Sequence, residues 1–362
     1  MTARSKVLAR VGLLLAALVV ALGFGELAFR IINARKNAPS GDDDAWRARY
    51  RRMNDTLYRR SANAELIYEP VAGSSVAMEY GHAAFNAGSM RDDIEYSHER
   101  GVLPRVAMVG DSIVWSEFVA LEKSLPRQVD SELNGQAELL NFGVTGYDTS
   151  QEAAWYETHV RQYHPDVVVV VYCMNDTMIM SGPFEHYATQ AERARKDEQD
   201  SFFARAGPIR RETVDGMIKA REESATFRLL ARAMGIWDRA RFDAHYTDEY
   251  LLMAQVPARR AQLQQALDRL GRAIRADGAK PLLVISPVLE SWRNYRWMSI
   301  HERVRDLATR AGFEVIDPLD YFRAHHNETA VRISGDNLHY NEEGNRVFGR
   351  AIATRVRELI AR

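Results

Sequence analysis

The chain has 362 residues, and its 48 lysines and arginines nearly balance its 49 aspartates and glutamates, which leaves a formal net charge of −1. A hydrophobic content of 46% is enough for a full core and excludes a disordered chain, and the balanced charge gives no field that favours a nucleic acid as a partner. The chain has a single cysteine, Cys173, so it forms no internal disulfide, and its cysteine usage does not indicate a compartment.

The N-terminus has the pattern of a membrane signal anchor. Residues 1–10 contain three basic side chains, and residues 11–25 are uncharged. The uncharged run alone would span only about 23 Å as a helix, so we extend the predicted transmembrane helix to residues 11–32 to cross a hydrocarbon core of about 30 Å. The alternative is a signal peptide cleaved after the small-residue site Ala21–Gly23, which would give a secreted protein. Either way, the basic flank predicts residues 1–10 in the cytoplasm and the bulk of the chain in the periplasm or outside the cell.

Residues 33–64 are polar and strongly charged, and we interpret them as a stalk that precedes a folded domain at 65–362. From residue 105 onward, short β-branched runs alternate with segments of helical pattern. This alternation predicts an α/β fold with a parallel sheet. The strand candidates are 105–110, 138–143, 166–173, 280–286 and 313–317, and the helix candidates are 116–133, 149–163, 257–276, 299–311 and 342–361.

One connection is far longer than the few residues that usually join a strand to a helix. It covers residues 178–256 approximately and contains many charges and several helix starts. We interpret it as a helical insertion after the third strand candidate, either as a lid or as a solvated packing face.

Chemically useful side chains follow the strand candidates, where parallel sheets bind ligands. Ser112 lies in a Gly-Asp-Ser turn directly after the first strand candidate, and an ordinary turn is the alternative interpretation. Asp336 and His339 have a spacing at which one turn can present both, so that the carboxylate orients the imidazole as a general base. The alternative for this pair is a turn with a surface histidine.

Two further residues suit the stabilisation of an oxyanion. Gly143 follows the second strand candidate and allows close approach to its backbone N–H, while Asn175 follows the third and carries a neutral amide donor. Taken singly, the glycine is an ordinary turn residue and the asparagine an ordinary helix cap. The order of these two residues together with the serine and the histidine indicates a catalytic site more specifically than any of the residues does alone.

With these residues in this order, the region 105–361 resembles the SGNH hydrolases, the GDSL-type esterases and lipases. The resemblance assigns Ser112 as the nucleophile, with Asp336 and His339 in the closing block and Gly143 and Asn175 in the blocks between. It implies a flavodoxin-like three-layer sandwich around a five-stranded parallel sheet, with neither metal nor cofactor. It also implies acyl transfer through an acyl-enzyme on the serine, whose own amide joins the other two donors at the oxyanion.

Two residues depart from the family pattern. Cys173 stands where the third block usually has glycine, which places close backbone approach near Asn175 in question, and Ile113 stands where leucine is usual. The segment before the first strand candidate resembles membrane-anchored bacterial members, and it contains Arg91, for which a structural salt bridge is the favoured interpretation over contact with the site.

The expected function is therefore a membrane-anchored serine esterase that removes a small acyl group, such as an O-acetyl group on a carbohydrate. The alternatives are an O-acetyltransferase for cell-surface polysaccharide, a lipid-ester or thioester hydrolase, and a non-catalytic membrane-tethered binding protein. Expected partners are the ester or polysaccharide substrate and the membrane, without nucleic acid. Three aromatic residues after the fourth strand candidate are interpreted as a substrate-binding rim, with packing of the next helix as the alternative: Trp292, Tyr295 and Trp297.

Overall fold

The computed structural model describes residues 50–177 and 257–361, apart from 291, 296 and 335, together with the isolated residues 187 and 189. The anchor predicted at 11–32 and nearly all of the insertion predicted at 178–256 lie outside the described residues. Within the described residues, no helix combines the length and the apolar character that crossing a membrane requires.

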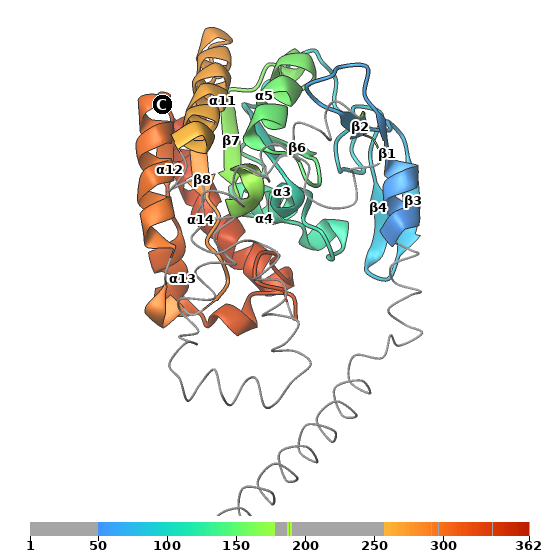
Figure 1. The fold of residues 1–362 in the computed structure, drawn as a ribbon. Helices are drawn as coiled ribbons and strands as arrows, with labels where there is room; N and C mark the ends of the chain where they lie inside the picture. The colour runs from blue at the N-terminus through green and yellow to red at the C-terminus, as the bar shows by residue number, and fades with distance from the viewer. Residues whose placement is uncertain are drawn as a thin grey trace, which may run out of the picture. The chain divides into compact units, whose positions relative to one another are not determined.

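A five-stranded parallel sheet forms the centre of the described chain, and it confirms the sheet predicted from the sequence (Figure 1). Every residue of β5 and of the central strand β7 is buried, and this burial was expected for β7 because of its run of valines. In spatial order the strands are β6 (Glu138–Gly143), β5 (Arg105–Gly110), β7 (Val167–Tyr172), β8 (Lys280–Ile285) and β9 (Glu314–Ile316).

The helices form two groups that cover the sheet. In one group α4 packs against α14, and in the other α11 packs against α5 and α12. Because parallel crossovers are right-handed and the chain moves outward from β5 in both directions, these groups lie on opposite faces and produce three layers. The helices are α4 (Leu125–Leu133), α5 (Thr149–Thr158), α11 (Pro257–Ala276), α12 (Met298–Arg310), the short α13 (Leu319–His325) and α14 (Glu342–Ile360).

The helix predicted at 116–133 is divided in the structure. A short helix α3 (Ser112–Trp115) begins at the serine itself and ends where Ser116 takes a left-handed φ of 59°. A loop and a 3₁₀ turn at Leu121–Lys123 follow before α4 begins. The prediction therefore missed α3 and wrongly included residues 116–124 in the longer helix, because the sequence pattern does not show that Ser116 and Phe118 are left-handed.

The folded unit begins earlier than the predicted boundary at residue 65. Residues 50–57 are helical, and Met53, Leu57 and Tyr58 are buried in the main core. The apolar residues in this charged segment lie four positions apart, so they share one helix face. Two small antiparallel sheets that the sequence did not indicate follow: β1 (Tyr58–Arg60) with β2 (Tyr68–Pro70), and β3 (Ser75–Met78) with β4 (Gly81–Ala84).

Candidate active site

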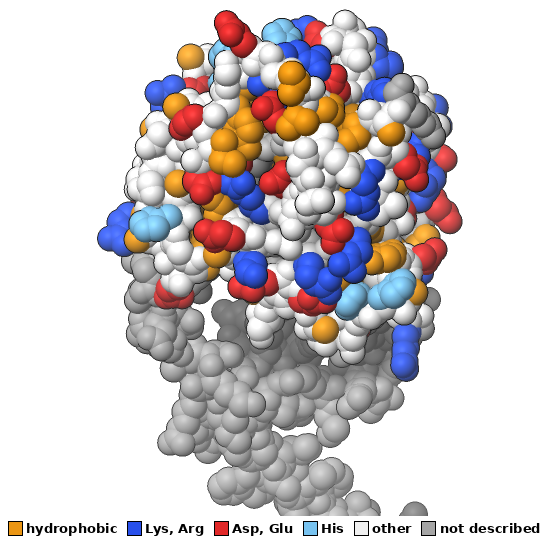
Figure 2. Space-filling view, turned by 180° about the vertical axis from the view of Figure 1, so that it is seen from behind, with side chains coloured by type: hydrophobic (Ala, Val, Ile, Leu, Met, Phe, Trp, Pro, Cys, Tyr) orange, Lys and Arg blue, Asp and Glu red, His pale blue; other side chains and the backbone are white. Residues whose placement is uncertain are grey.

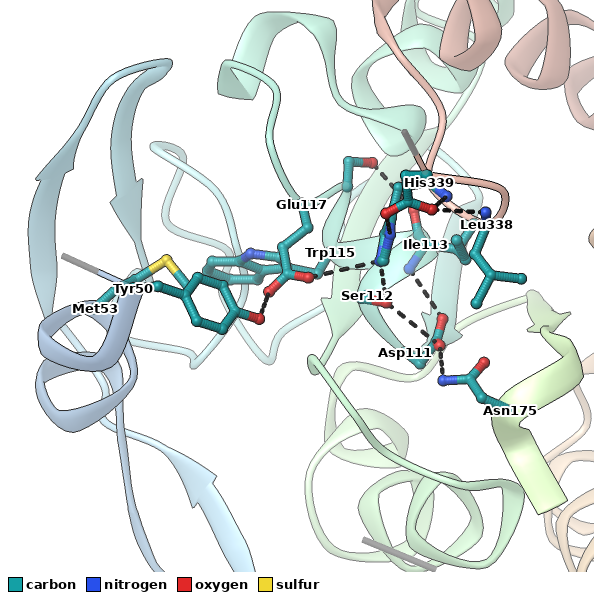
Figure 3. Close-up of polar contacts among 12 residues, drawn as sticks. Tyr50, Met53, Asp111, Ser112, Ile113, Trp115, Glu117, Asn175, Leu338 and His339 are labelled. Carbon is teal, nitrogen blue, oxygen red and sulfur yellow. Dashed lines mark hydrogen bonds and ion pairs between the residues drawn. The ribbon is translucent and has the colours of Figure 1, made fainter. Parts of the chain in front are cut away.

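The topology brings the predicted site residues to one edge of the sheet. The strand order reverses between β5 and β7, which is where doubly wound sheets bind ligands. Ser112 follows β5, and Asn175 lies in the 3₁₀ turn Met174–Thr177 that follows β7. Asp336 and His339 reach the same place from the loop before α14. Figure 3 shows His339 beside Ser112.

A continuous chain of hydrogen bonds joins the serine to the histidine and the histidine to the aspartate. Ser112 Oγ lies 2.8 Å from His339 Nε2, and His339 Nδ1 lies 2.7 Å from Asp336 Oδ2. Because a carboxylate only accepts, Nδ1 carries the hydrogen, and Nε2 is then free to accept from the serine hydroxyl. The structure thus brings the side chains of these three residues together.

Asp336 is fixed by its own loop. Its Oδ1 accepts from the backbone N–H groups of Leu338, at 2.7 Å, and of His339, at 3.0 Å. Burial opposes its charge, but the hydrogen bond and the charge of His339 outweigh burial and lower the pKa of Asp336 to about 2. The aspartate is therefore ionised throughout the neutral range.

The pKa of His339 is shifted in the opposite direction from that of Asp336. Burial opposes the imidazolium, yet the hydrogen bond to Asp336 and the charges of Glu117 and Asp336 outweigh it, so the pKa of His339 lies above its ordinary value. An imidazole with raised proton affinity is a stronger base toward the serine hydroxyl.

Asp111 connects the serine turn to the turn that carries Asn175. Its carboxylate caps α3 by accepting from the N–H of Ile113 at 2.9 Å, and it accepts from Asn175 Nδ2 at 3.0 Å. The side chain is fully buried, and burial raises the pKa of Asp111. One hydrogen of the Asn175 amide is used in this contact, which leaves the second for another acceptor.

Gly143 has a packing role that the sequence did not reveal. A β-carbon here would lie 2.3 Å from the backbone nitrogen of Trp115 and 2.7 Å from the carbonyl carbon of Val114, so only glycine lets α3 pack onto β6. Its N–H already donates to Asn141 Oδ1 at 3.0 Å. The expected oxyanion donor at this position is therefore occupied in the structure.

Cys173 replaces the usual glycine without backbone strain. It is not among the described residues with positive φ, so the position does not need glycine. The thiol is buried, and burial raises the pKa of Cys173 well above its ordinary value. The nearby Asp176 carboxylate accepts from the Cys173 N–H at 3.0 Å, which holds this turn closed.

The aromatic residues predicted as a substrate rim belong instead to the core, which is a correction. Trp292, Tyr295 and Trp297 are 4%, 9% and 0% exposed, respectively. Trp292 donates to the carbonyl of Val288 and packs on Phe322, and the Tyr295 hydroxyl contacts His301. Their faces are covered by protein, so the packing interpretation is the correct one.

Among the residues that the structure describes, Arg91 forms neither the predicted salt bridge nor a contact with the reacting groups. It is 1% exposed, and its guanidinium donates to the backbone carbonyls of Trp115, of Ser116 at 2.7 Å and of Val119 at 2.6 Å. It also lies over the Trp115 ring, with its Cζ 4.8 Å from the ring centroid. Arg91 therefore fixes the loop after α3.

Sequence analysis did not identify the second carboxyl group that lies beside the histidine. Glu117 is 3% exposed, and its Oε2 lies 3.6 Å from His339 Nε2 (Figure 3). The hydroxyl of Tyr50 donates to Glu117 Oε1 at 2.7 Å. The available signal was an acidic residue within the apolar run after the serine, in a position where solvation is unfavourable. Within the described residues, no cluster of three or more histidine, cysteine or acidic side chains suits a metal ion.

A family model described as the GDSL-like lipase/acylhydrolase family matches residues 108–347, which is more than half of the chain. No curated protein matches the sequence. The structure of TesA is 14% identical over 70% of this chain and 99% of that one, with a TM-score of 0.42. A catalytic mutant of Axe2, an acetylxylan esterase from Geobacillus stearothermophilus, is 15% identical over 71% and 94%, with a TM-score of 0.40. A two-domain esterase active on acetylated mannans is 13% identical over 72% and 50%, with a TM-score of 0.40.

Proposed function

This chain belongs to the GDSL-like lipase/acylhydrolase family and is an ester hydrolase, and we propose that it removes a small acyl group through an acyl-enzyme on Ser112. The observation that carries the proposal is the continuous hydrogen-bond chain from Ser112 through His339 to Asp336, with links of 2.8 and 2.7 Å. A serine hydroxyl alone is a weak nucleophile, and this arrangement supplies the base and its orienting group.

The proposed reaction has two symmetric halves. Ser112 Oγ bonds to the ester carbonyl carbon while its proton passes to His339 Nε2. The ester C–O bond then breaks, and His339 returns the proton to the departing alcohol. In the second half water bonds to the acyl carbon and gives a proton to His339. The bond between the acyl carbon and Ser112 Oγ then breaks, the acid leaves, and His339 returns the proton to Ser112 Oγ.

The oxyanion is assigned to the Ser112 N–H and the second amide hydrogen of Asn175. The Gly143 N–H would have to exchange its bond to Asn141 for one to the oxyanion, since its acceptor lies 3.0 Å away. A donor aimed at the developing charge typically contributes about 10²–10³ in rate.

The test of the nucleophile is the Ser112→Ala variant with p-nitrophenyl acetate as substrate. We expect kcat to fall by about 10⁴-fold or more, because the acyl-enzyme cannot form. Ser131→Ala, on the exposed side of α4, is the matched control and should retain full activity. A fluorophosphonate should label the native chain at Ser112. Undiminished turnover by Ser112→Ala, or labelling elsewhere only, would contradict the proposal.

The small acyl group is supported by the limited exposure of the reacting side chains, since Ser112 is 7% exposed and the His339 side chain 16%. A series of p-nitrophenyl esters from acetate to decanoate should show kcat/KM falling with chain length. A rise with chain length would favour a lipid-ester hydrolase instead.

A carbohydrate O-acetyl ester remains our proposed natural substrate, on the basis of the predicted outward position of the domain. Release of acetate from acetylated xylan or glucomannan tests it, and a polysaccharide acceptor that gains label from an acetyl donor would identify a transferase. The membrane position is also a proposal. Alkaline phosphatase fused after residue 362 should be active, and the N-terminal sequence of the mature chain distinguishes an anchor from a cleaved signal.

A further inference from the structure

A buried carboxyl group faces His339 from the side of the nucleophile. Asp336 binds Nδ1, whereas Glu117 Oε2 lies 3.6 Å from Nε2, the nitrogen that contacts Ser112. The Glu117 side chain is 3% exposed, so its interaction with the imidazole is screened little by water.

The loop that carries Glu117 is held in an unusual conformation. The residues on either side of it, Ser116 and Phe118, have φ values of 59° and 69°, which non-glycine residues adopt at a cost. Arg91 binds the carbonyls of Ser116 and Val119, and Ser116 Oγ accepts from the Leu125 N–H at 2.7 Å. Backbone strain that several contacts maintain is typical of functional segments.

Two aromatic residues surround the carboxyl group and the imidazole. The Phe118 ring meets the His339 ring edge to face, with centroids 5.2 Å apart and planes at 87°. Tyr50, from the helical residues 50–57, lies 6.4 Å from Phe118 and donates its hydroxyl hydrogen to Glu117. Figure 3 shows Tyr50, Glu117 and His339 in a row that ends at Ser112.

We propose that Glu117 is a positioning residue of the reaction, which holds the protonated imidazole of His339 from the nucleophile side, and that Tyr50 orients Glu117 for this role. The inference rests on the proposed function, because the imidazolium exists only if His339 accepts the proton of Ser112. Glu117 itself neither gains nor loses an atom in the cycle.

A second carboxylate would act on the side of the ring that Asp336 does not reach. The two oxygens of Asp336 bind Nδ1 and two backbone N–H groups, so it stabilises the far side of the ring. When Ser112 attacks, the new N–H forms on Nε2, and an opposite charge 3.6 Å from that nitrogen favours the charged ring.

The charged and titratable groups that surround His339 and Glu117 come from several elements, and they influence how these two residues titrate. Burial raises the pKa of Glu117, while the charge of His339 and the hydrogen bond from Tyr50 lower it. The titratable and charged groups that face the pair are Asp336 from the loop before α14, Asp111 from the turn after β5, Tyr50 and Tyr58 from the N-terminal segment, Tyr80 from the turn between β3 and β4, and Arg91.

The first measurement is the pH dependence of kcat/KM for p-nitrophenyl acetate in the native chain and three variants. Glu117→Gln keeps the shape but removes the charge, so the protonated form of His339 loses support. The acidic limb should move to lower pH by about one unit, and the plateau should fall by about threefold to tenfold. Tyr50→Phe should move the limb in the same direction by a smaller amount. Glu122→Gln, exposed in the 3₁₀ turn that follows this loop, is the matched control and should leave the acidic limb and the plateau unchanged.

The second measurement does not depend on turnover. Proton titration of His339 by NMR of histidine-labelled protein, with the signal assigned through His339→Gln, should show a lower pKa in Glu117→Gln than in the native chain. Circular dichroism checks that each variant is folded. Should Glu117→Gln fail to fold, the titration of Tyr50→Phe, which retains the glutamate, decides between the outcomes.

The outcomes separate the inference from the proposed function. Ser112-dependent hydrolysis with an unmoved acidic limb and an unmoved His339 titration in Glu117→Gln would overturn the inference and leave the proposed function intact. A native chain that hydrolyses no ester would overturn the proposed function, and a lower His339 pKa in Glu117→Gln would then still support the electrostatic contact while removing its catalytic purpose.

Discussion

Two carboxyl groups approach the ring of His339 from different surroundings. Asp336 is 27% exposed and accepts two backbone N–H groups, whereas Glu117 is 3% exposed and has the hydroxyl of Tyr50 as its donor. The first therefore remains ionised at low pH, while burial raises the pKa of the second. Their positions, with Asp336 at Nδ1 and Glu117 beside Nε2, assign Asp336 to the tautomer and the orientation of the ring and Glu117 to the other nitrogen.

Replacement of Asp336 by asparagine tests the assignment of the tautomer. An amide can donate to Nδ1, which would leave the hydrogen on Nε2, where it blocks acceptance of the serine proton. We expect kcat for p-nitrophenyl acetate to fall by about 10²–10⁴-fold, with little change in the melting temperature.

Asp320→Asn is the control for this variant, because its carboxylate is 93% exposed on α13, where it pairs with Arg323. It should retain full activity. An Asp336→Asn variant with nearly native kcat would show that the carboxylate does not select the tautomer.

Contacts between residues that are close in the sequence could be predicted, whereas contacts between residues that only the fold brings together could not. Asp336 and His339 are three residues apart in sequence, so their contact was readable from spacing. Glu117 meets His339 through the fold alone. Trp292 and Tyr295 have the composition of a binding rim, but contacts with Phe322 and Arg323, from a later helix, bury them. Burial by residues that are distant in the sequence cannot be predicted from the residues next to the buried side chain.

At the scale of elements, the turn between β5 and α3 is held against β6 by backbone contact. Gly110 pairs with Gly143 across β5 and β6, and the Val144 N–H donates to the Gly110 carbonyl at 2.9 Å. The helix that begins with Ser112 lies directly over Gly143, without space for a side chain. The position of the serine is therefore set by the glycine of the neighbouring strand.

The Gly143→Ala variant should displace α3 and the serine together. A methyl group 2.3 Å from the Trp115 nitrogen cannot be accommodated unless the backbone moves. We expect a loss of about 1–3 kcal/mol in the free energy of unfolding and a fall in kcat of about 10²-fold. Urea unfolding followed by circular dichroism and the p-nitrophenyl acetate assay measure the two effects.

Gly101→Ala is the matched control, since a β-carbon there would have its nearest neighbour at 3.7 Å. It should change neither quantity. A stable and fully active Gly143→Ala variant would mean that the turn tolerates displacement and that the glycine serves another purpose.

The elements that the sequence predicted well are those with a strong apolar pattern. The strands at 105–110 and 138–143 and the helix at 257–276 have the predicted bounds. The four short N-terminal strands were missed because they are three or four residues long and partly exposed. The break after α3 was missed because Ser116 and Phe118 are left-handed without being glycine.

At the scale of the whole molecule, balanced charge at the surface contrasts with a concentration of acid inside. On the face in Figure 2, acidic and basic side chains are interspersed. Five carboxyl groups in and beside the site turns are at most 5% exposed: Asp111, Glu117, Asp148, Glu152 and Asp176. Within the described residues, neither carboxylate oxygen of Glu152 has a hydrogen-bond partner, and Asp176 Oδ1 has none either.

These buried acids bind protons more tightly in the folded state. Burial, with the charges of Asp111 and Asp148, raises the pKa of Glu152 well above its ordinary value, and burial with the charge of Glu152 raises that of Asp176. In the unfolded chain a glutamate ionises near pH 4.3. Between that pH and its raised folded value, unfolding releases a proton, so stability decreases as the pH rises through this window.

The Glu152→Gln variant should therefore be more stable than the native chain at pH 8 and no different at pH 4. Glutamine has the same shape and cannot ionise, so it removes the proton release that favours unfolding. We expect a gain of about 1–3 kcal/mol at pH 8, seen as a melting temperature higher by about 2–8 °C, and this gain should shrink steadily as the pH is lowered. Glu302→Gln, on the exposed side of α12, should leave the melting temperature unchanged at both values. Destabilisation by Glu152→Gln at pH 8 would contradict the argument, because it would mean that the carboxylate is charged in the folded state and held there by favourable contacts.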